Sequence, residues 1–196
     1  KKMKKLKSVL LFLIVIFTLI RCKNELKDSK KEHNIIEETS TKDNSEAKEY
    51  SINFNRSLTL QNITFNIKNK GNGSISQLDI EAIGLELDNQ NISLELDGQV
   101  VNAEIEDLNS DGFPEILIYT VSAGSGSYGN VIGYSVNNGK SISQIYFPEI
   151  FENKAASIGY MGHDEFAIVE TSLVRRFSVY KDGDTNNNPT GGTRQI

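Results

Sequence analysis

The chain has 196 residues, which allows one domain of ordinary size, or one domain and a tail. Its formal net charge of −5 is unevenly distributed, because residues 1–21 carry six Lys or Arg and no acidic residue. Removing those six from 21 leaves 15 basic residues against 26 acidic ones, a net charge of −11. This charge argues against binding to nucleic acid and favours a cationic partner. A single cysteine excludes intrachain disulfides, Cys-based zinc sites and CxxC redox chemistry, and two histidines leave little for His-based catalysis.

Residues 1–21 have the pattern of a secretory signal. A lysine-rich start is followed by an apolar run over 9–20, which is short for a membrane-spanning helix. The only cysteine, Cys22, follows directly, and the string Thr18-Leu-Ile-Arg-Cys22 resembles a bacterial lipobox, although Arg21 stands where a small residue is usual. We therefore predict a lipoprotein-type signal over 1–21 and lipidation of Cys22. An ordinary signal cut elsewhere, or an uncleaved anchor, is the alternative interpretation.

Residues 22–49 are rich in Lys, Glu, Asp, Ser and Asn and contain few apolar residues. Such a segment cannot bury enough surface to offset the entropy lost on ordering. We predict a flexible tether between membrane and domain, in which His33 is solvated.

From residue 50 onward, apolar and polar residues alternate with the period of two that is typical of a half-buried strand. Gly, Asn and Asp separate these stretches at the spacing common in sandwiches and barrels. We therefore predict an all-β domain over 50–196, an antiparallel β-sandwich of about eight strands. The predicted strands cover 57–67 in two stretches, 75–87 with a break at Gly84, 92–96, 100–105, 115–121, 131–136, 142–147, 166–170 and 173–180.

The string Asp107-Leu-Asn-Ser-Asp-Gly-Phe-Pro-Glu115 has Asp, Asn, Asp and Gly at positions 1, 3, 5 and 6 of a calcium loop. Ile118 stands where an EF-hand has its bidentate Glu, so the string is no EF-hand. Two interpretations stay open. One is a calcium-binding loop between strands, and the other is a tight turn without metal, because Asn, Asp and Gly favour such turns.

The segment Ser122-Ala-Gly-Ser-Gly-Ser-Tyr-Gly129 joins two predicted strands and is longer and richer in glycine than a hairpin needs. A tyrosine among small residues is a frequent recognition device, because the phenol offers contact area and a hydrogen-bonding tip at low entropic cost. We expect Gly124, Gly126 and Gly129 to keep the loop thin and to permit positive φ. A flexible connector is the alternative interpretation.

The string Gly159-Tyr-Met-Gly-His-Asp-Glu-Phe166 places His163 beside two acidic residues. The predicted domain has no second histidine and no activated nucleophile, so we expect a structured loop in which His163 packs or hydrogen-bonds locally. Arg175 and Arg176 lie inside a predicted strand. Adjacent strand residues point to opposite faces, so at most one of the two arginines serves a given surface.

Five strings, in their order and spacing, resemble the periplasmic inhibitors of i-type (invertebrate-type) lysozyme over about residues 54–196. These strings are 107–116, 122–129, 159–166, 172–177 and 191–195. The resemblance implies an antiparallel β-sandwich, members that can form homodimers, and a protruding loop that inserts into the lysozyme's active-site cleft. Carried onto this sequence, that loop is Ser125, Gly126, Ser127, Tyr128 and Gly129, with Ser125 and Tyr128 as the leading contacts. In that family a further strand follows the Gly-Thr-Arg-Gln string, so we expect the sandwich to lack its last strand in this chain.

The resemblance implies a protein inhibitor and not an enzyme, with no metal and no cofactor, whose partner is i-type lysozyme. It would protect peptidoglycan in the periplasm or at the outer membrane of a Gram-negative bacterium, tethered there by a lipid on Cys22. Lysozymes cleave with two carboxyl groups in an open groove, to which the hydroxyls of Ser125 and Tyr128 can donate. Two alternatives stay open. They are a calcium-dependent surface-binding lipoprotein built around Asp107–Glu115, and an inhibitor of c-type lysozyme, although that family commonly has disulfides.

Overall fold

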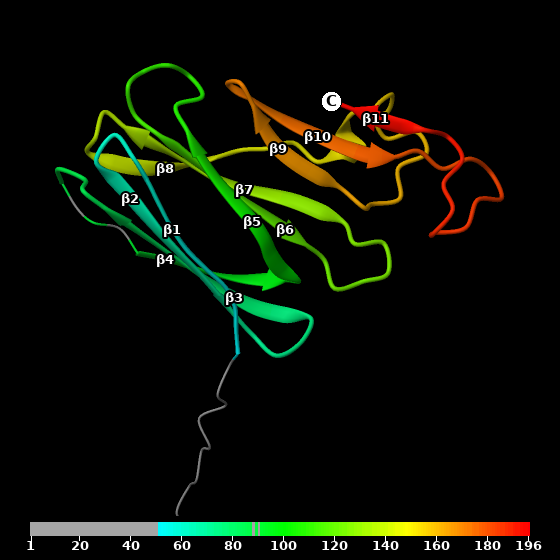
Figure 1. Cartoon of the computed structure of the whole chain (residues 1–196), viewed down its shortest axis with the longest axis horizontal. Helices are drawn as coiled ribbons and strands as arrows, with labels where there is room; N and C mark the ends of the chain where they lie inside the picture. The colour runs from blue at the N-terminus through cyan, green and yellow to red at the C-terminus, as the bar shows by residue number, and fades with distance from the viewer. Residues whose placement is uncertain (1–50, 88, 90) are drawn as a thin grey trace, which may run out of the picture. The chain divides into compact units, whose positions relative to one another are not determined.

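The computed structural model describes residues 51–196, apart from residues 88 and 90. In this part of the chain, eleven strands form three antiparallel sheets, and one short 3₁₀ helix, η1 (Ile150–Glu152), lies between β8 and β9 (Figure 1). The predicted all-β, antiparallel, sandwich-like fold is confirmed. The predicted signal over 1–21, the lipidation of Cys22 and the tether over 22–49 lie outside the described residues. Among the residues described, no helix is long and apolar enough to cross a membrane.

The first sheet contains the first four strands in chain order. Gln61 and Asn62 have φ of 49° and 65° and turn the chain between the first two strands, as expected for a tight two-residue hairpin. The alternation of apolar and polar residues in the second and third strands places every second side chain on the inner face. The strands are β1 (Ile52–Leu60), β2 (Ile63–Lys70), β3 (Ile75–Ile83) and β4 (Asn91–Asp97).

The second sheet contains the next four strands, again in chain order. Its second strand is buried from Glu115 to Thr120, whereas its first strand is buried only at Val100 and Ala103. A strand buried at six successive positions must be covered on both of its faces, because successive side chains point to opposite sides. The strands are β5 (Gln99–Glu106), β6 (Glu115–Val121), β7 (Gly129–Asn137) and β8 (Ser141–Ile145).

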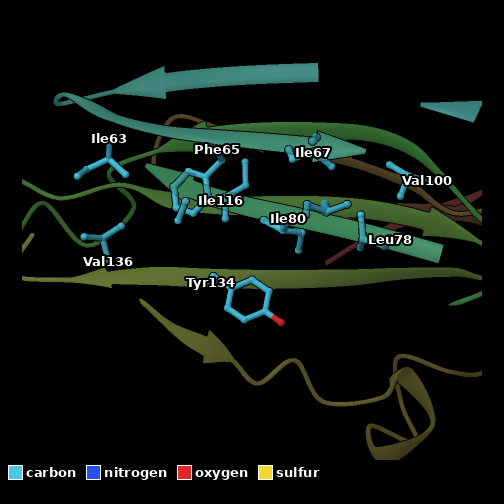
Figure 2. Packing of buried hydrophobic residues seen from close by; sticks show 12 residues of the cluster. Ile63, Phe65, Ile67, Leu78, Ile80, Val100, Ile116, Tyr134 and Val136 are labelled. Atoms are coloured by element: carbon cyan, nitrogen blue, oxygen red, sulfur yellow. The ribbon is translucent and has the colours of Figure 1, made fainter. Parts of the chain in front are cut away.

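The main core lies between the first and second sheets. Side chains from β2 and β3 meet side chains from β5, β6 and β7, and most of the twelve buried members are aliphatic (Figure 2). β6 contributes Ile116 and Ile118 to this core, both with no exposed surface. The buried members are Ile63, Phe65, Ile67, Leu78, Ile80, Ala82, Val100, Ala103, Ile116, Ile118, Tyr134 and Val136.

A third sheet covers the other face of the second one. Its strands are ordered β11 (Thr193–Gln195), β10 (Ser172–Ser178) and β9 (Glu165–Val169). Leu117 and Tyr119 of β6 pack against Phe166 of β9, whose ring stacks on that of Tyr119 at a centroid distance of 5.5 Å. The Tyr119 hydroxyl donates to Glu104, and the same carboxylate oxygen accepts the backbone N–H of Ile168, which ties the second sheet to the third.

The structure differs from the sequence prediction in the number of strands and sheets. Eleven strands form within the described residues, against about eight predicted. The strand predicted over 75–87 ends at Ile83, before Gly84 with its φ of 97°. β11 is only three residues long, lies beyond the last predicted strand and forms by pairing with β10. An alternating pattern indicates that one face of a strand is buried, but it does not indicate which element covers that face. The sequence therefore did not predict the third sheet.

Truncation of neighbouring β6 residues tests whether this strand is covered on both faces. We expect Leu117→Ala and Ile118→Ala each to lower the free energy of unfolding by about 2–5 kcal/mol, because each leaves a cavity in a different core. Denaturant unfolding measures both effects. If the face that carries Leu117 were open to solvent, that variant would change stability by about 0.5 kcal/mol or less, as an ordinary surface substitution does.

Candidate functional site

The loop over residues 122–129 joins β6 to β7, and its five residues 125–129 are called the key loop below. It lies at the same end of the molecule as the segment 159–164 and the loop 181–192, on the right in Figure 1. Ser122 closes its base, because the Ser122 N–H donates to the carbonyl of Tyr128 (2.9 Å) and the Tyr128 N–H donates to Ser122 Oγ (3.0 Å). The loop therefore starts from a strand that is buried on both faces and returns over a closed pair of hydrogen bonds.

The glycines of this loop provide space and do not provide positive φ, which corrects the sequence expectation. None of Gly124, Gly126 and Gly129 is at positive φ, whereas Ser127 has a φ of 45°. A β-carbon at Gly126 would lie 2.5 Å from Tyr128 Cε2, and one at Gly129 would lie 2.6 Å from Asp164 Cβ. Both glycines are required because neighbouring side chains pack against their α-carbons.

The segment 159–164 supports the loop from one side. The His163 N–H donates to the carbonyls of Gly126 (3.0 Å) and Ser127 (3.1 Å). Gly162 has a φ of 87°, and a β-carbon there would overlap the Gly126 carbonyl oxygen. The expected structured loop with locally hydrogen-bonded His163 therefore forms, through the His163 N–H and through a longer contact between His163 Nε2 and Asn186 Oδ1 (3.4 Å).

Asp164 is the centre of this support, with a side chain that has no exposed surface. Its Oδ2 accepts the Gly129 N–H (2.7 Å) and the Tyr160 hydroxyl (2.6 Å), and its Oδ1 accepts Arg175 Nε–H (2.7 Å). Arg175 Nη2 also donates to the Tyr160 hydroxyl (2.8 Å). Burial, followed by the hydrogen bond to Asp164, raises the pKa of Tyr160 well above its ordinary value. The network ties the start of β7 to β10.

The two arginines of β10 point to opposite faces, as the sequence predicts. Arg175 is held among the rings of Tyr160 and Phe166, with its Cζ 5.0 Å and 5.4 Å from their centroids. Arg176 pairs with Glu165 on the exposed face. Only Arg175 belongs to the support of the key loop.

The loop 181–190 supports the key loop from a second side. Asn186 Nδ2 donates to the carbonyl of Ser125 (2.6 Å), and the carbonyl of Asn186 accepts the Tyr180 hydroxyl (2.7 Å). The Asp184 carboxylate closes this loop by accepting the N–H groups of Lys181 (2.7 Å) and Thr190 (2.8 Å). These hydrogen bonds, that from Lys181 first, lower the pKa of Asp184.

Asn186, Tyr160 and Asp164 support the site but were not predicted from the sequence. Tyr160 and Asp164 lie inside the string 159–166, in which only His163 suggested a chemical role from the sequence. Asn186 stands in a run of three asparagines, and nothing in the sequence distinguishes it from the other two. Only the contact with the key loop identifies it.

Ser125 and Tyr128 are the exposed side chains that this arrangement presents. Ser125 is exposed and Tyr128 is 45% exposed, and the Tyr128 ring rests against Tyr160 in an edge-to-face contact at 5.7 Å. In residues 51–196, leaving out 88 and 90, no hydrogen bond to either side-chain hydroxyl is found. The key loop therefore offers two hydroxyl groups to a partner.

The string Asp107–Glu115 lies at the opposite end of β6 from the key loop, roughly 20 Å away by the length of the strand. Its carboxylates accept the loop's own N–H groups, with Asp107 bonded to Asp111 and Gly112, and Glu115 bonded to Leu108. Desolvation raises the pKa of Asp107, but hydrogen bonds from Gln61, Gly112 and Asp111 outweigh it and lower the pKa overall.

These hydrogen bonds are those of a tight turn, and calcium binding by this loop stays a prediction. Among the described residues, no group of three His, Cys, Asp or Glu side chains is arranged to hold a metal ion.

Removal of the Asp164 carboxylate tests the central network. We expect Asp164→Ala to lower the free energy of unfolding by about 3–5 kcal/mol, because it leaves Arg175 as a buried charge without its partner. Glu165→Ala is the matched control, since it breaks the adjacent but exposed pair with Arg176 and should cost no more than about 1 kcal/mol. Chemical denaturation of the two variants measures the difference. Equal losses of stability would show that Asp164 has no special role.

The stabilising effect of Asp184 should depend on pH. Its folded-state pKa is lowered, so its contribution is complete above the ordinary value of 3.8 and is lost as the pH falls through the folded-state pKa. We expect Asp184→Ala to be less stable than the unsubstituted protein at pH 7 and the difference to disappear in strong acid. Thermal unfolding across this pH range measures it, and a difference that is constant with pH would contradict the assignment.

Comparison of the chain with family models, with curated proteins and with solved structures finds no match in any of the three. What can be said of function therefore depends on the geometry of the key loop and on the resemblance of the sequence strings.

Proposed function

We propose that the protein inhibits i-type lysozyme by inserting its key loop into the active-site cleft of that enzyme. The observation that carries the proposal is the rigid presentation of Ser125 and Tyr128. Backbone hydrogen bonds from His163 and a side-chain hydrogen bond from Asn186 hold the loop, while both hydroxyls remain exposed. Three of the five strings that resemble the inhibitor family, 122–129, 159–166 and 172–177, contribute residues to this site, and the proposal unites the two observations.

Inhibition on this model requires no chemistry by the inhibitor. A lysozyme cleaves with two carboxyl groups in an open groove, so a thin loop that fills the groove excludes the polysaccharide. The Ser125 and Tyr128 hydroxyls would hydrogen-bond those carboxyl groups. Because the loop is already ordered by its neighbours, little conformational entropy is lost on binding.

The charge and export signals support the same proposal. The chain beyond residue 21 has a net charge of −11, and opposite charge accelerates the encounter with a cationic lysozyme. A signal over 1–21 and a lipid on Cys22 would place the inhibitor in the periplasm or at the outer membrane. There it would meet the enzyme before the enzyme reaches peptidoglycan. Homodimer formation, as in members of that family, belongs to the same proposal.

Substitution of the two exposed key-loop residues tests the proposal. We expect Tyr128→Ala to weaken inhibition of i-type lysozyme by about 30-fold or more, the size of an interface hot spot of about 2 kcal/mol. Ser125→Ala should weaken it by about 5-fold, since one hydrogen bond contributes about 1 kcal/mol. A cell-wall lysis assay measures both, with c-type and g-type lysozymes alongside to establish the class.

Leu87→Ala is the control, because Leu87 is 74% exposed and lies outside the key loop and the segments that support it. It should inhibit as the unsubstituted protein does. If Tyr128→Ala and Ser125→Ala both retain full inhibition with unchanged thermal unfolding, the role of the key loop is wrong. If the protein inhibits only c-type lysozyme, the class of partner is wrong.

A further inference from the structure

The segment 146–161, which joins β8 to β9, exposes large apolar side chains close together in the chain. Its exposed members are Tyr146, Phe151, Ile158 and Met161. Such side chains are ordinary when scattered singly over a surface, but a group of them marks an interaction site. Phe151 is the aromatic one without a polar tip, and it is 62% exposed.

Phe151 and the key loop share one supporting ring. Tyr160 is buried, and both Phe151 and Tyr128 pack against it edge to face, at centroid distances of 5.6 Å and 5.7 Å. Met161 follows Tyr160 and precedes Gly162, whose α-carbon lies against the carbonyl of Gly126. Phe151 therefore packs on the same ring as Tyr128, and Met161 lies in the segment that supports the key loop; we call these two residues the flank.

The flank is held as firmly as the loop. Phe151 belongs to η1, whose first residue, Ile150, is buried. Arg194 Nη1 donates to the carbonyls of Ala156 (2.6 Å) and Ile158 (2.8 Å), and so fixes the turn between η1 and Tyr160. A surface that is ordered before binding loses little entropy when a partner covers it.

We propose that the flank, Phe151 and Met161, is a second contact surface for the same lysozyme and packs against apolar side chains at the rim of its cleft. The inference rests on the proposed function and extends it. Its reason is area, because a stable protein–protein interface occupies about 20–30 residues on each side and the key loop has five. A partner that covers Tyr128 must also meet what lies beside it, and aromatic and methionine side chains are enriched in interfaces.

The test is the affinity of the full chain for an i-type lysozyme, measured by surface plasmon resonance. We expect Phe151→Ala to weaken binding about 10-fold and Met161→Ala about 3-fold, mainly through faster dissociation. Phe151→Leu should retain most of the affinity, because it keeps apolar area. Leu87→Ala is the matched control, since Leu87 is an exposed apolar residue at 74% exposure outside the flank.

Amide hydrogen exchange distinguishes direct contact from an effect on the key loop. The N–H groups of Ser127 and Gly129 are hydrogen-bonded within the site, and we expect their protection to be unchanged in Phe151→Ala. Faster exchange at these amides, together with weaker binding, would mean that Phe151 only positions the loop and would overturn the proposal.

Three further outcomes also decide the proposal. Unchanged affinity in both flank variants, with weaker binding by Tyr128→Ala, overturns the flank and leaves the key loop in place. If Phe151→Ala changes the oligomeric state but not the affinity for lysozyme, the flank contacts a second copy of the chain. This result also overturns the proposal. An unsubstituted protein that binds no i-type lysozyme overturns the proposed function, and the flank as its extension.

Discussion

The buried Asp164 carboxylate is the interaction on which the key-loop end of the molecule depends. A carboxylate without exposed surface is stable only when its charge and its lone pairs are satisfied. Here three donors from three elements converge on it: the N–H of Gly129 at the start of β7, the Tyr160 hydroxyl and the guanidinium of Arg175 in β10. The second sheet, the third sheet and the segment between them are thereby fixed relative to one another at the base of the key loop.

The layered fold explains why that loop can be rigid. β6 is covered on one face by the first sheet, through Ile116 and Ile118, and on the other by the third sheet, through Leu117 and Tyr119. A strand that is packed on both faces cannot shift without opening two cores. The loop 122–129, which contains the key loop, starts at its end, so the position of the loop is set by a strand that is buried at six successive positions.

Sequence patterns predicted features that depend on the residue's own strand, such as the direction of a side chain. They did not predict contacts with segments that are distant in the sequence. Alternation predicted most strands and the opposite directions of Arg175 and Arg176. The unbroken apolar run in β6 was a signal for cover on both faces, although it could not identify the third sheet. The reason for glycine at 126 and 129 could not be predicted from the sequence, because Tyr128 and Asp164, whose side chains leave no room for a β-carbon there, contact these glycines only in the folded molecule.

The same network also determines what kind of group the loop can present. Arg175 lies beside the loop, but its charge is paired internally with Asp164, so the polar side-chain groups that the loop exposes are the hydroxyls of Ser125 and Tyr128. In a glycosidase one carboxyl group is protonated and the other ionised. A hydroxyl can accept from the first and donate to the second, whereas an ammonium or guanidinium can only donate. Neutral hydroxyls on a rigid loop therefore suit a site with two carboxyl groups in different protonation states better than a cation would.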